Sequence, residues 1–190
     1  MEALNAYIQQ GGVFMFPIIA GAAWGLVLVF ERIIFYLQKT ALISSQSKAF
    51  TDELKSGGVE KATVWLSKQK GLLPVVLKAG LENTHLPVDR ISEKMEAVLL
   101  RELPQYSRFL NFIAVLSSLM PMFGLLGTVT GMIATFKVIA LQGTGDAQAM
   151  AGGIAEALLT TQAGLVAAIP MILGHTYVSS KLKRITDNVK

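Results

Sequence analysis

One carboxylate, Glu156, stands in a stretch from Ala147 to Val178 that otherwise contains no Asp, Glu, Lys or Arg. Threonine hydroxyls follow it at Thr160 and Thr161. A charged side chain at membrane depth is costly, so an acid in such a stretch is a functional candidate by default. A carboxyl group removed from water can exchange a proton, as in a relay, or it can stay protonated and donate a hydrogen bond between helices. These residues alone leave both roles open.

A second stripe of small and polar residues comes earlier in the chain. Its members recur at spacings of 3, 4, 3 and 4, which places them on one helix face: Pro121, Gly124, Thr128, Gly131 and Thr135. Gly127 and Gly131 also form a GxxxG pattern, which is typical of close helix contacts in membranes. The stripe predicts either a narrow, mildly polar wall or close packing alone, with the Thr128 hydroxyl bonded to its own backbone.

The stretch around Glu156 has the same design. Small and polar residues share one broad helix face: Gly152, Gly153, Glu156, Thr160, Ala163, Gly164 and Ala167. Thr161 and Gln162 lie to one side of this face and widen it into a polar sector. The backbone near Glu156 can therefore approach a neighbouring helix or leave room for water.

The composition indicates that these stripes belong to membrane helices. The 190 residues are 52% hydrophobic and only 16% charged, with a mean hydropathy of +0.50, which is too apolar for an ordinary soluble domain. Three stretches are long enough to cross a bilayer: 13–37, 109–141 and 147–178. We predict an all-α integral membrane protein with three transmembrane helices, the second and third long and extending into a cytoplasmic helical bundle.

The distribution of Lys and Arg predicts the orientation of these spans. Residues 1–12 and the connection 142–146 contain none, whereas residues 38–108 contain eleven and the tail 179–190 contains four. The positive-inside rule places the N-terminus and the 142–146 loop outside, and the 38–108 region and the tail in the cytoplasm. Topology thus explains the basic excess, and without a nucleic-acid-reading motif we expect no binding to DNA or RNA.

The segments outside the spans also carry local signals. Residues 1–12 have the spacing of a short amphipathic helix on the outer leaflet. The polar 38–108 region is expected to be helical, with breaks at Gly57–Gly58 and at 71–74. A helix that starts after Pro87 is expected to run through Pro104 into the second span.

Catalysis is not expected of this chain. The cytoplasmic region of about seventy residues can bury only a modest core. The sequence contains no nucleophile with a base, no metal-ligand cluster and no phosphate loop, so we predict neither an enzyme nor a cofactor. The pair Glu31–Arg32 is either an interfacial pair or part of an ion path, Lys137 is expected to snorkel, and His85 to be solvated.

Two sequence runs now support a resemblance. Residues 120–136 read MPMFGLLGTVTGMIATF, and residues 153–170 read GIAEALLTTQAGLVAAIP. Together they resemble the signature of the MotA/TolQ/ExbB proton-channel family, most closely its ExbB and TolQ branch. Glu31–Arg32 is similar to the family's pattern in the first span, whereas residues 1–12 and 38–108 match only in length and character.

The resemblance implies a multi-pass protein of the bacterial inner membrane with its N-terminus in the periplasm and its C-terminus in the cytoplasm. It implies a homo-oligomer, a pentamer in this family, whose pore encloses the single transmembrane helices of an ExbD- or TolR-like partner. In the family, an Asp of that partner helix carries the proton. Such a complex couples the proton motive force to work at the outer membrane or envelope, for example TonB-dependent transport.

The resemblance also assigns roles to residues. Thr128 and Thr161 match polar pore-facing positions, and Glu156 matches the pore-lining glutamate. Thr160 stands where small residues are common in the family, which leaves open which of Thr160 and Thr161 faces the partner. Five glycines are expected to serve helix packing: Gly124, Gly127, Gly131, Gly153 and Gly164. The alternative from another class is a membrane scaffold that oligomerises through these glycine faces and conducts no protons.

Overall fold

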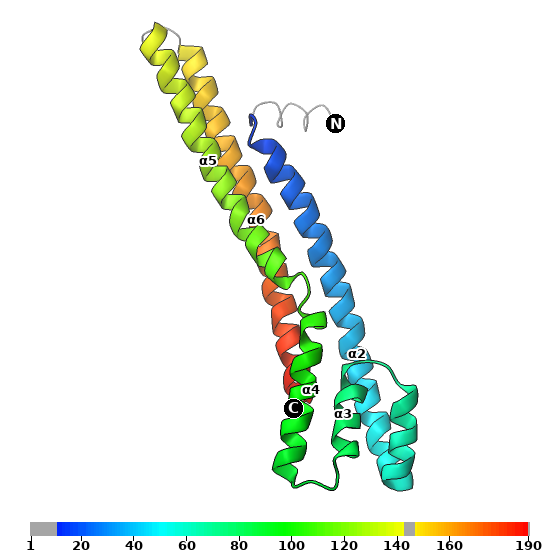
Figure 1. Ribbon diagram of the computed structural model, residues 1–190. Coiled ribbons are helices and arrows are strands. Elements are labelled where there is room, and N and C mark those ends of the chain that lie inside the picture. Colours follow the sequence, from blue (N-terminus) through cyan, green and yellow to red (C-terminus); the bar gives the residue numbers. More distant parts are fainter. Residues whose placement is uncertain (1–10, 143–146, 190) are drawn as a thin grey trace. The chain divides into compact units, whose positions relative to one another are not determined.

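The computed structural model describes residues 11–142 and 147–189, which form helices and contain no strand (Figure 1). The helices are α2 (Met15–Lys68), α3 (Leu72–Glu82), α4 (Val88–Tyr106), α5 (Leu110–Gln142) and α6 (Ala147–Val189). Of these, α2, α5 and α6 are long and apolar enough to cross a membrane. The predicted all-α fold with three spans is therefore confirmed. The amphipathic helix expected at 1–12 and the connection 142–146 fall almost wholly outside the described residues.

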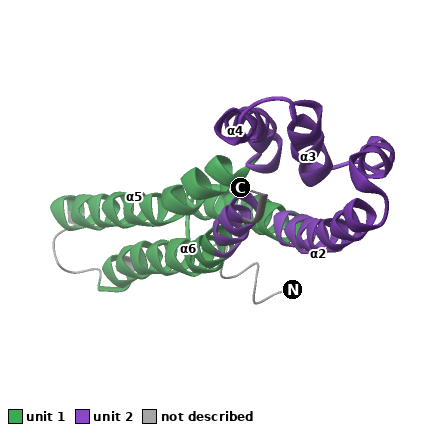
Figure 2. Ribbon diagram, turned by 90° about the horizontal axis from the view of Figure 1, so that it is seen from below, with its two compact units in different colours: residues 1–31, 109–176 green, residues 32–108, 177–190 purple. Residues whose placement is uncertain are grey.

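The chain divides into two compact units (Figure 2). Unit 1 comprises residues 1–31 and 109–176, so it holds the beginning of α2, all of α5 and most of α6. Unit 2 comprises residues 32–108 and 177–190, which include the rest of α2, all of α3 and α4, and the end of α6. Both stripes described above belong to unit 1.

The first helix continues well past the predicted span. Residues 26–56 contain no Gly or Pro, so nothing in the sequence interrupts the helix there, and α2 extends to Lys68. Its regular geometry fails at Gly58, where φ is 67° and ψ is −167°. That backbone conformation is essentially restricted to glycine. The predicted break at Gly57–Gly58 is confirmed. The second break, predicted at 71–74, lies instead at 69–71, because residues 72–74 already belong to α3.

The expected passage of one helix through Pro104 into the second span is wrong. α4 includes Pro104 but ends at Tyr106, and α5 begins only at Leu110. Between them, Phe109 has a φ of 66°, a conformation that is unusual for a bulky residue and cannot continue a helix. The second span therefore starts as a new helix, whereas α6 does run on beyond residue 178 to Val189.

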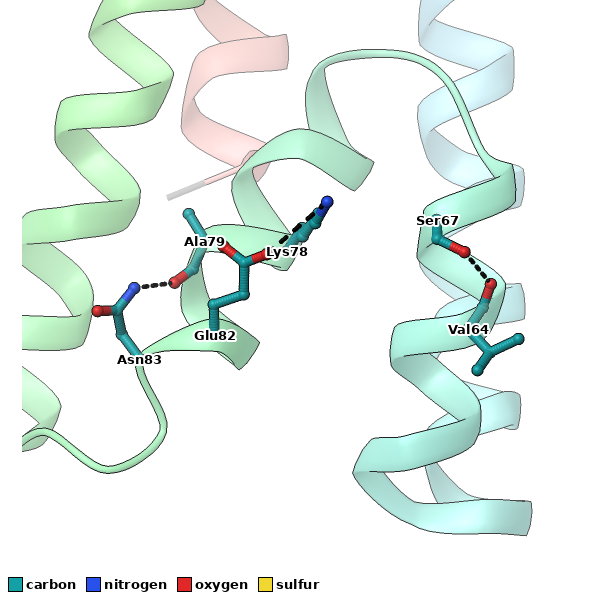
Figure 3. A network of polar contacts seen from close by, with 6 residues as sticks. All are labelled: Val64, Ser67, Lys78, Ala79, Glu82 and Asn83. Atoms are coloured by element: carbon teal, nitrogen blue, oxygen red, sulfur yellow. Dashed lines mark hydrogen bonds and ion pairs between the residues drawn. The ribbon is translucent and has the colours of Figure 1, made fainter.

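Large side chains and helix ends hold unit 2 together. Tyr36 of α2 is fully buried and donates a hydrogen bond of 2.5 Å to the backbone oxygen of Tyr106 at the end of α4. Burial raises the pKa of Tyr106, against the lowering effect of a hydrogen bond with the Leu72 backbone. Figure 3 shows the end of α3, where the Asn83 side chain donates to the Ala79 oxygen at 2.8 Å and so satisfies a terminal carbonyl.

Candidate functional site

The two helices that carry the stripes, α5 and α6, lie side by side with their backbones in close approach (Figure 1). A Cβ atom added to Gly164 would come within 2.6 Å of the Met120 oxygen and 3.2 Å of the Gly124 Cα atom. A Cβ atom at Gly131 would lie 3.0 Å from the Gly153 oxygen. A larger residue at Gly164 or Gly131 would clash with backbone atoms of the neighbouring helix, which cannot rotate away as side chains can.

Thr161 joins the two helices by a hydrogen bond. Its hydroxyl donates to the backbone oxygen of Gly124 at 2.9 Å, across 37 residues of sequence. Gly124 is part of an α-helix, so its oxygen accepts this bond in addition to its place in the helical ladder. Thr161 is half-buried.

Thr160 lies inside the same contact. Only 1% of its surface is exposed, and its hydroxyl is within hydrogen-bond distance of two carbonyl oxygens of its own helix, those of Ala157 at 2.8 Å and Glu156 at 3.2 Å. Its side chain also fills the space beside Gly127, where a Cβ atom would lie 2.5 Å from the Thr160 Cβ. The position of Thr160 is therefore a packing position within this helix pair.

Two threonines of α5 bond to their own helix but differ in burial. Thr128 is half-buried and donates to the Leu125 oxygen at 2.7 Å. Thr135 is 4% exposed, donates to the Gly131 oxygen at 3.0 Å and packs against Gly153. Thr128 consequently lies at the border of the α5–α6 contact, whereas Thr135 lies within it.

Glu156 faces the beginning of α2. Its carboxylate lies so close to Gly12 that a Cβ atom there would overlap Oε1 and come within 2.8 Å of Cδ. Gly12 also has a φ of 65°, in the left-handed region that favours glycine. The left-handed backbone therefore favours glycine at position 12, and a side chain there would displace the Glu156 carboxylate.

Below Gly12, α2 packs on the helix pair through small residues and methionines. Gly21 lies against Met120 of α5, and Gly25 lies against Met171 of α6. Ile18 joins the same buried cluster, together with Ala167 and Ala168. A neighbouring groove of about 410 Å³ between α2 and α6 is lined by apolar residues apart from Gln162. The α2 side of the pair is thus apolar except at Gln162 and Glu156.

The sequence-predicted residues therefore separate into three groups. Seven of these residues lie at the α5–α6 contact: Thr160, Thr161 and the glycines Gly124, Gly127, Gly131, Gly153 and Gly164. Thr128 lies at its border, and Glu156 lies on the side of α6 that faces α2. Within the described part of the chain, the Glu156 side chain shares no hydrogen bond with Thr128 or Thr161.

Sequence reasoning missed Gly12. Nothing near position 12 in the chain points to a carboxylate 144 residues later. The one usable signal is a glycine directly before an apolar helix. Among the described residues, no three His, Asp or Glu side chains gather where they could hold a metal ion.

Comparisons with known proteins point to one family. The sequence model of the MotA/TolQ/ExbB proton channel family matches residues 68–190, which contain α5, α6 and the stripe residues described above. A putative ExbB homolog of Methanothermobacter thermautotrophicus is 27% identical over 184 residues, which cover 96% of this chain and 65% of the relative. ExbB-like protein 1 of Synechocystis is 32% identical over 172 residues, 86% of this chain and 66% of the relative.

A relative from the second branch covers less of the chain. The Tol-Pal system protein TolQ of Haemophilus influenzae is 34% identical over 94 residues, half of this chain and 41% of the relative. The chain spans just under two thirds of the length of the two ExbB-like relatives above.

The fold and the site define an all-α, multi-pass membrane protein whose apolar helices carry a carboxylate and hydrogen-bonded threonines. The chain belongs to the MotA/TolQ/ExbB proton channel family, and within it to the ExbB/TolQ branch. Proteins of this family are membrane channel and transport proteins and not enzymes.

Proposed function

We propose that this chain is a proton-channel subunit of an energy-transducing complex in the bacterial inner membrane. In this proposal it forms a homo-oligomer, a pentamer as in the family, around an ExbD- or TolR-like partner with one transmembrane helix and a transmembrane Asp. The complex couples the proton motive force to work at the outer membrane or envelope, with a TonB-like protein as one recipient. The N-terminus is periplasmic and the C-terminus cytoplasmic, in agreement with the Lys and Arg distribution.

The observation that supports the proposal is the hydrogen bonding of two half-buried threonines. Thr128 and Thr161 each donate their hydroxyl proton to a backbone oxygen, at 2.7 and 2.9 Å. A hydroxyl whose proton is engaged still offers its oxygen as an acceptor. Both threonines therefore present acceptors, which suit the O–H of a protonated carboxylic acid and not an ionised carboxylate.

This polarity gives the threonines a specific role. A neutral, protonated Asp on the partner helix can donate to Thr161 or Thr128 while it passes through the apolar part of the membrane. An ionised Asp gains no such bond and would be costly there. The pathway thus favours movement of the partner's carboxyl group in its protonated form, and Glu156 exchanges the proton near the outer end of the helices. Thr160, buried between α5 and α6, supports their packing in this mechanism.

The test of this polarity compares two variants of Thr161. In liposomes that contain the purified oligomer with its partner, an imposed pH gradient drives proton uptake, which a pH-sensitive dye inside the liposomes records. Thr161→Val removes the acceptor and is expected to lower the uptake rate by roughly tenfold, the equivalent of one hydrogen bond to a carboxyl group. Thr161→Ser keeps the hydroxyl and is expected to keep most of the rate. Equal rates for Thr161→Val and the wild type would contradict the role.

The second candidate, a scaffold that conducts no protons, is favoured by the close α5–α6 contact, since glycine faces serve packing in many membrane proteins. The same liposomes distinguish it from a channel. A scaffold shows no proton uptake above that of empty liposomes and no change when the partner's transmembrane Asp is replaced by Asn. A channel subunit shows uptake that depends on the partner and on that Asp.

A further inference from the structure

Unit 2 contains a basic cavity that the proposed proton pathway does not use. It has a volume of about 390 Å³ and is lined by residues of α2 and by the end of α4 with the segment after it: Arg32, Phe35, Lys39, Gln105, Tyr106 and Arg108. Arg32, Phe35 and Lys39 are three and four residues apart, so they share one face of α2. The hydrogen bond from Tyr36 to the Tyr106 oxygen fixes this face against the end of α4.

The lining of the basic cavity is positively charged. Three of its six residues are cations, and none is an acid. Arg32 is only 6% exposed, with its guanidinium 5.0 Å from the centre of the Phe35 ring, and the Lys39 ammonium lies 5.5 Å from the same ring. Both cations are thus held beside one aromatic ring in the lining of the cavity.

Two acids that neighbour the lining residues in sequence are outside the lining itself. Glu102 accepts a hydrogen bond from the Gln105 side chain at 3.2 Å, and Glu31 is exposed at the position before Arg32. Tyr106 is a neutral phenol at ordinary pH, since burial raises its pKa. An anion is therefore the ligand that the charge of this lining favours.

The sequence places the basic cavity at the boundary of the membrane. Arg32 follows the uncharged run 13–30, and Arg108 stands two residues before the apolar helix α5. The end of one span and the start of the next must lie at the same membrane surface, because residues 38–108 contain no further span. Ile34 and Leu37, which flank the lining residues on α2, are 56% and 50% exposed and offer apolar contacts beside the charges.

We propose that the basic cavity binds the phosphate headgroup of an anionic phospholipid, with the acyl chains along the exposed apolar side chains of α2. Charge complementarity, the buried Arg32 and the position at the membrane surface select this ligand. Basic pockets at this depth, on the cytoplasmic side, are suited to anionic headgroups. A bound lipid links α2 to the end of α4 within unit 2.

The test measures lipid that stays bound to the full-length protein. The protein is equilibrated in vesicles of phosphatidylcholine with a minor fraction of phosphatidylglycerol, extracted in mild detergent, and its retained lipids are counted by mass spectrometry. We expect phosphatidylglycerol to be enriched over its fraction in the vesicles. The double variant Lys39→Gln with Arg108→Gln changes two rim residues and leaves the buried Arg32 in place. Retention is expected to fall by roughly fivefold for each cation removed.

A matched control separates a site from general attraction. Lys94→Gln with Arg101→Gln removes the same charge from exposed positions of α4 that do not line the basic cavity. This control is expected to retain phosphatidylglycerol like the wild type, and circular dichroism establishes that both double variants keep their helices. Equal losses in both double variants, or no enrichment in the wild type, would overturn the proposal. Full displacement by inorganic phosphate at millimolar concentration would overturn the assignment to a lipid.

Discussion

Glycine has different roles at the α5–α6 contact of unit 1 and at Gly58 of unit 2. In unit 1, the glycines between α5 and α6 have ordinary helical geometry and are surrounded by backbone atoms, as at Gly164 and Gly131. In unit 2, Gly58 has nothing within 4 Å of an added Cβ atom but a φ of 67°, so its role is conformational. The glycines at the α5–α6 contact bring two helices together, whereas Gly58 bends α2.

The difference reflects the surroundings of each unit. Between lipid-facing helices no hydrophobic driving force favours association, so stability comes from close backbone packing and from hydrogen bonds such as that of Thr161 with Gly124. The 38–108 region is polar, and burial of large side chains such as Leu72 and Leu99 stabilises its fold. The comparison predicts which substitutions damage each unit and why.

The largest effect on stability is expected for Gly164→Val. The added side chain would overlap the Met120 oxygen and the Gly124 backbone, so α5 and α6 must separate. Overpacking of this kind costs about 3 kcal/mol in the free energy of unfolding. Titration of the purified protein with a denaturing detergent, followed by circular dichroism, measures this change. Stability like that of the wild type would show that the two backbones are not in contact.

Gly152→Ala is the matched control on the same helix. An added Cβ atom there meets nothing within 4 Å, and the backbone is helical. Alanine has a higher helix propensity than glycine, so this variant is expected to be as stable as the wild type or more stable, by up to about 1 kcal/mol. Destabilisation by Gly152→Ala would mean that loss of glycine itself, and not crowding, weakens α6.

A smaller effect is expected for Gly58→Ala in unit 2. No atom blocks the added methyl group, so the entire cost is backbone strain, about 2 kcal/mol. The variant can relieve the strain if α2 becomes regular at position 58, and limited proteolysis of the 38–108 region would then show an altered pattern. An unchanged free energy of unfolding together with an unchanged cleavage pattern would contradict the conformational role.

The smallest of these effects is expected for Tyr36→Phe. It removes the hydrogen bond to the Tyr106 oxygen and preserves the ring that packs against Phe35. A buried hydrogen bond contributes about 1 kcal/mol, and the same detergent titration measures its loss. Tyr177→Phe is the control, because this tyrosine is 42% exposed. Equal effects of the two variants would argue that the buried bond contributes nothing.

The sequence predicts the features of this fold that depend on composition and local spacing. Three spans follow from three long, mostly apolar stretches, and the break at Gly58 follows from a glycine pair. The break before α5 could not be predicted, because its unusual residue is Phe109, a type that gives no turn signal, whereas Pro104 is accommodated within α4. The prediction of one helix running through Pro104 into the second span is therefore wrong. The interruption lies at a residue with an unusual backbone conformation, and its residue type does not signal a turn.

The candidate site can likewise be predicted only in part from the sequence. Periodicity alone places Gly124, Gly131 and Thr135 on one face of α5. It cannot tell that Thr160 is enclosed while Thr161 reaches Gly124, since that depends on how α6 is rotated against α5. Nor can periodicity predict the contact between Gly12 and Glu156, because it joins distant parts of the chain and depends on the packing of α2.

The contact between Gly12 and Glu156 gives a functional prediction. Gly12→Ala adds a methyl group where the Glu156 carboxylate lies, so the carboxylate must move while the rest of α6 stays in place. We expect slower proton uptake in liposomes with helical content like that of the wild type, and Gly152→Ala again serves as the control. Uptake equal to that of the wild type would show that the position of the carboxylate is not set by Gly12.

The most direct test of the proposed function is the proton uptake rate of liposomes that contain the oligomer and its partner, with wild-type protein or with Glu156→Gln. Glutamine keeps the size and hydrogen-bonding ability of the side chain but cannot exchange a proton. A group that transfers protons typically contributes about a hundredfold or more to a rate, so we expect a loss of about that size. An unchanged rate for Glu156→Gln would remove this carboxylate from the pathway and leave it a structural role beside Gly12.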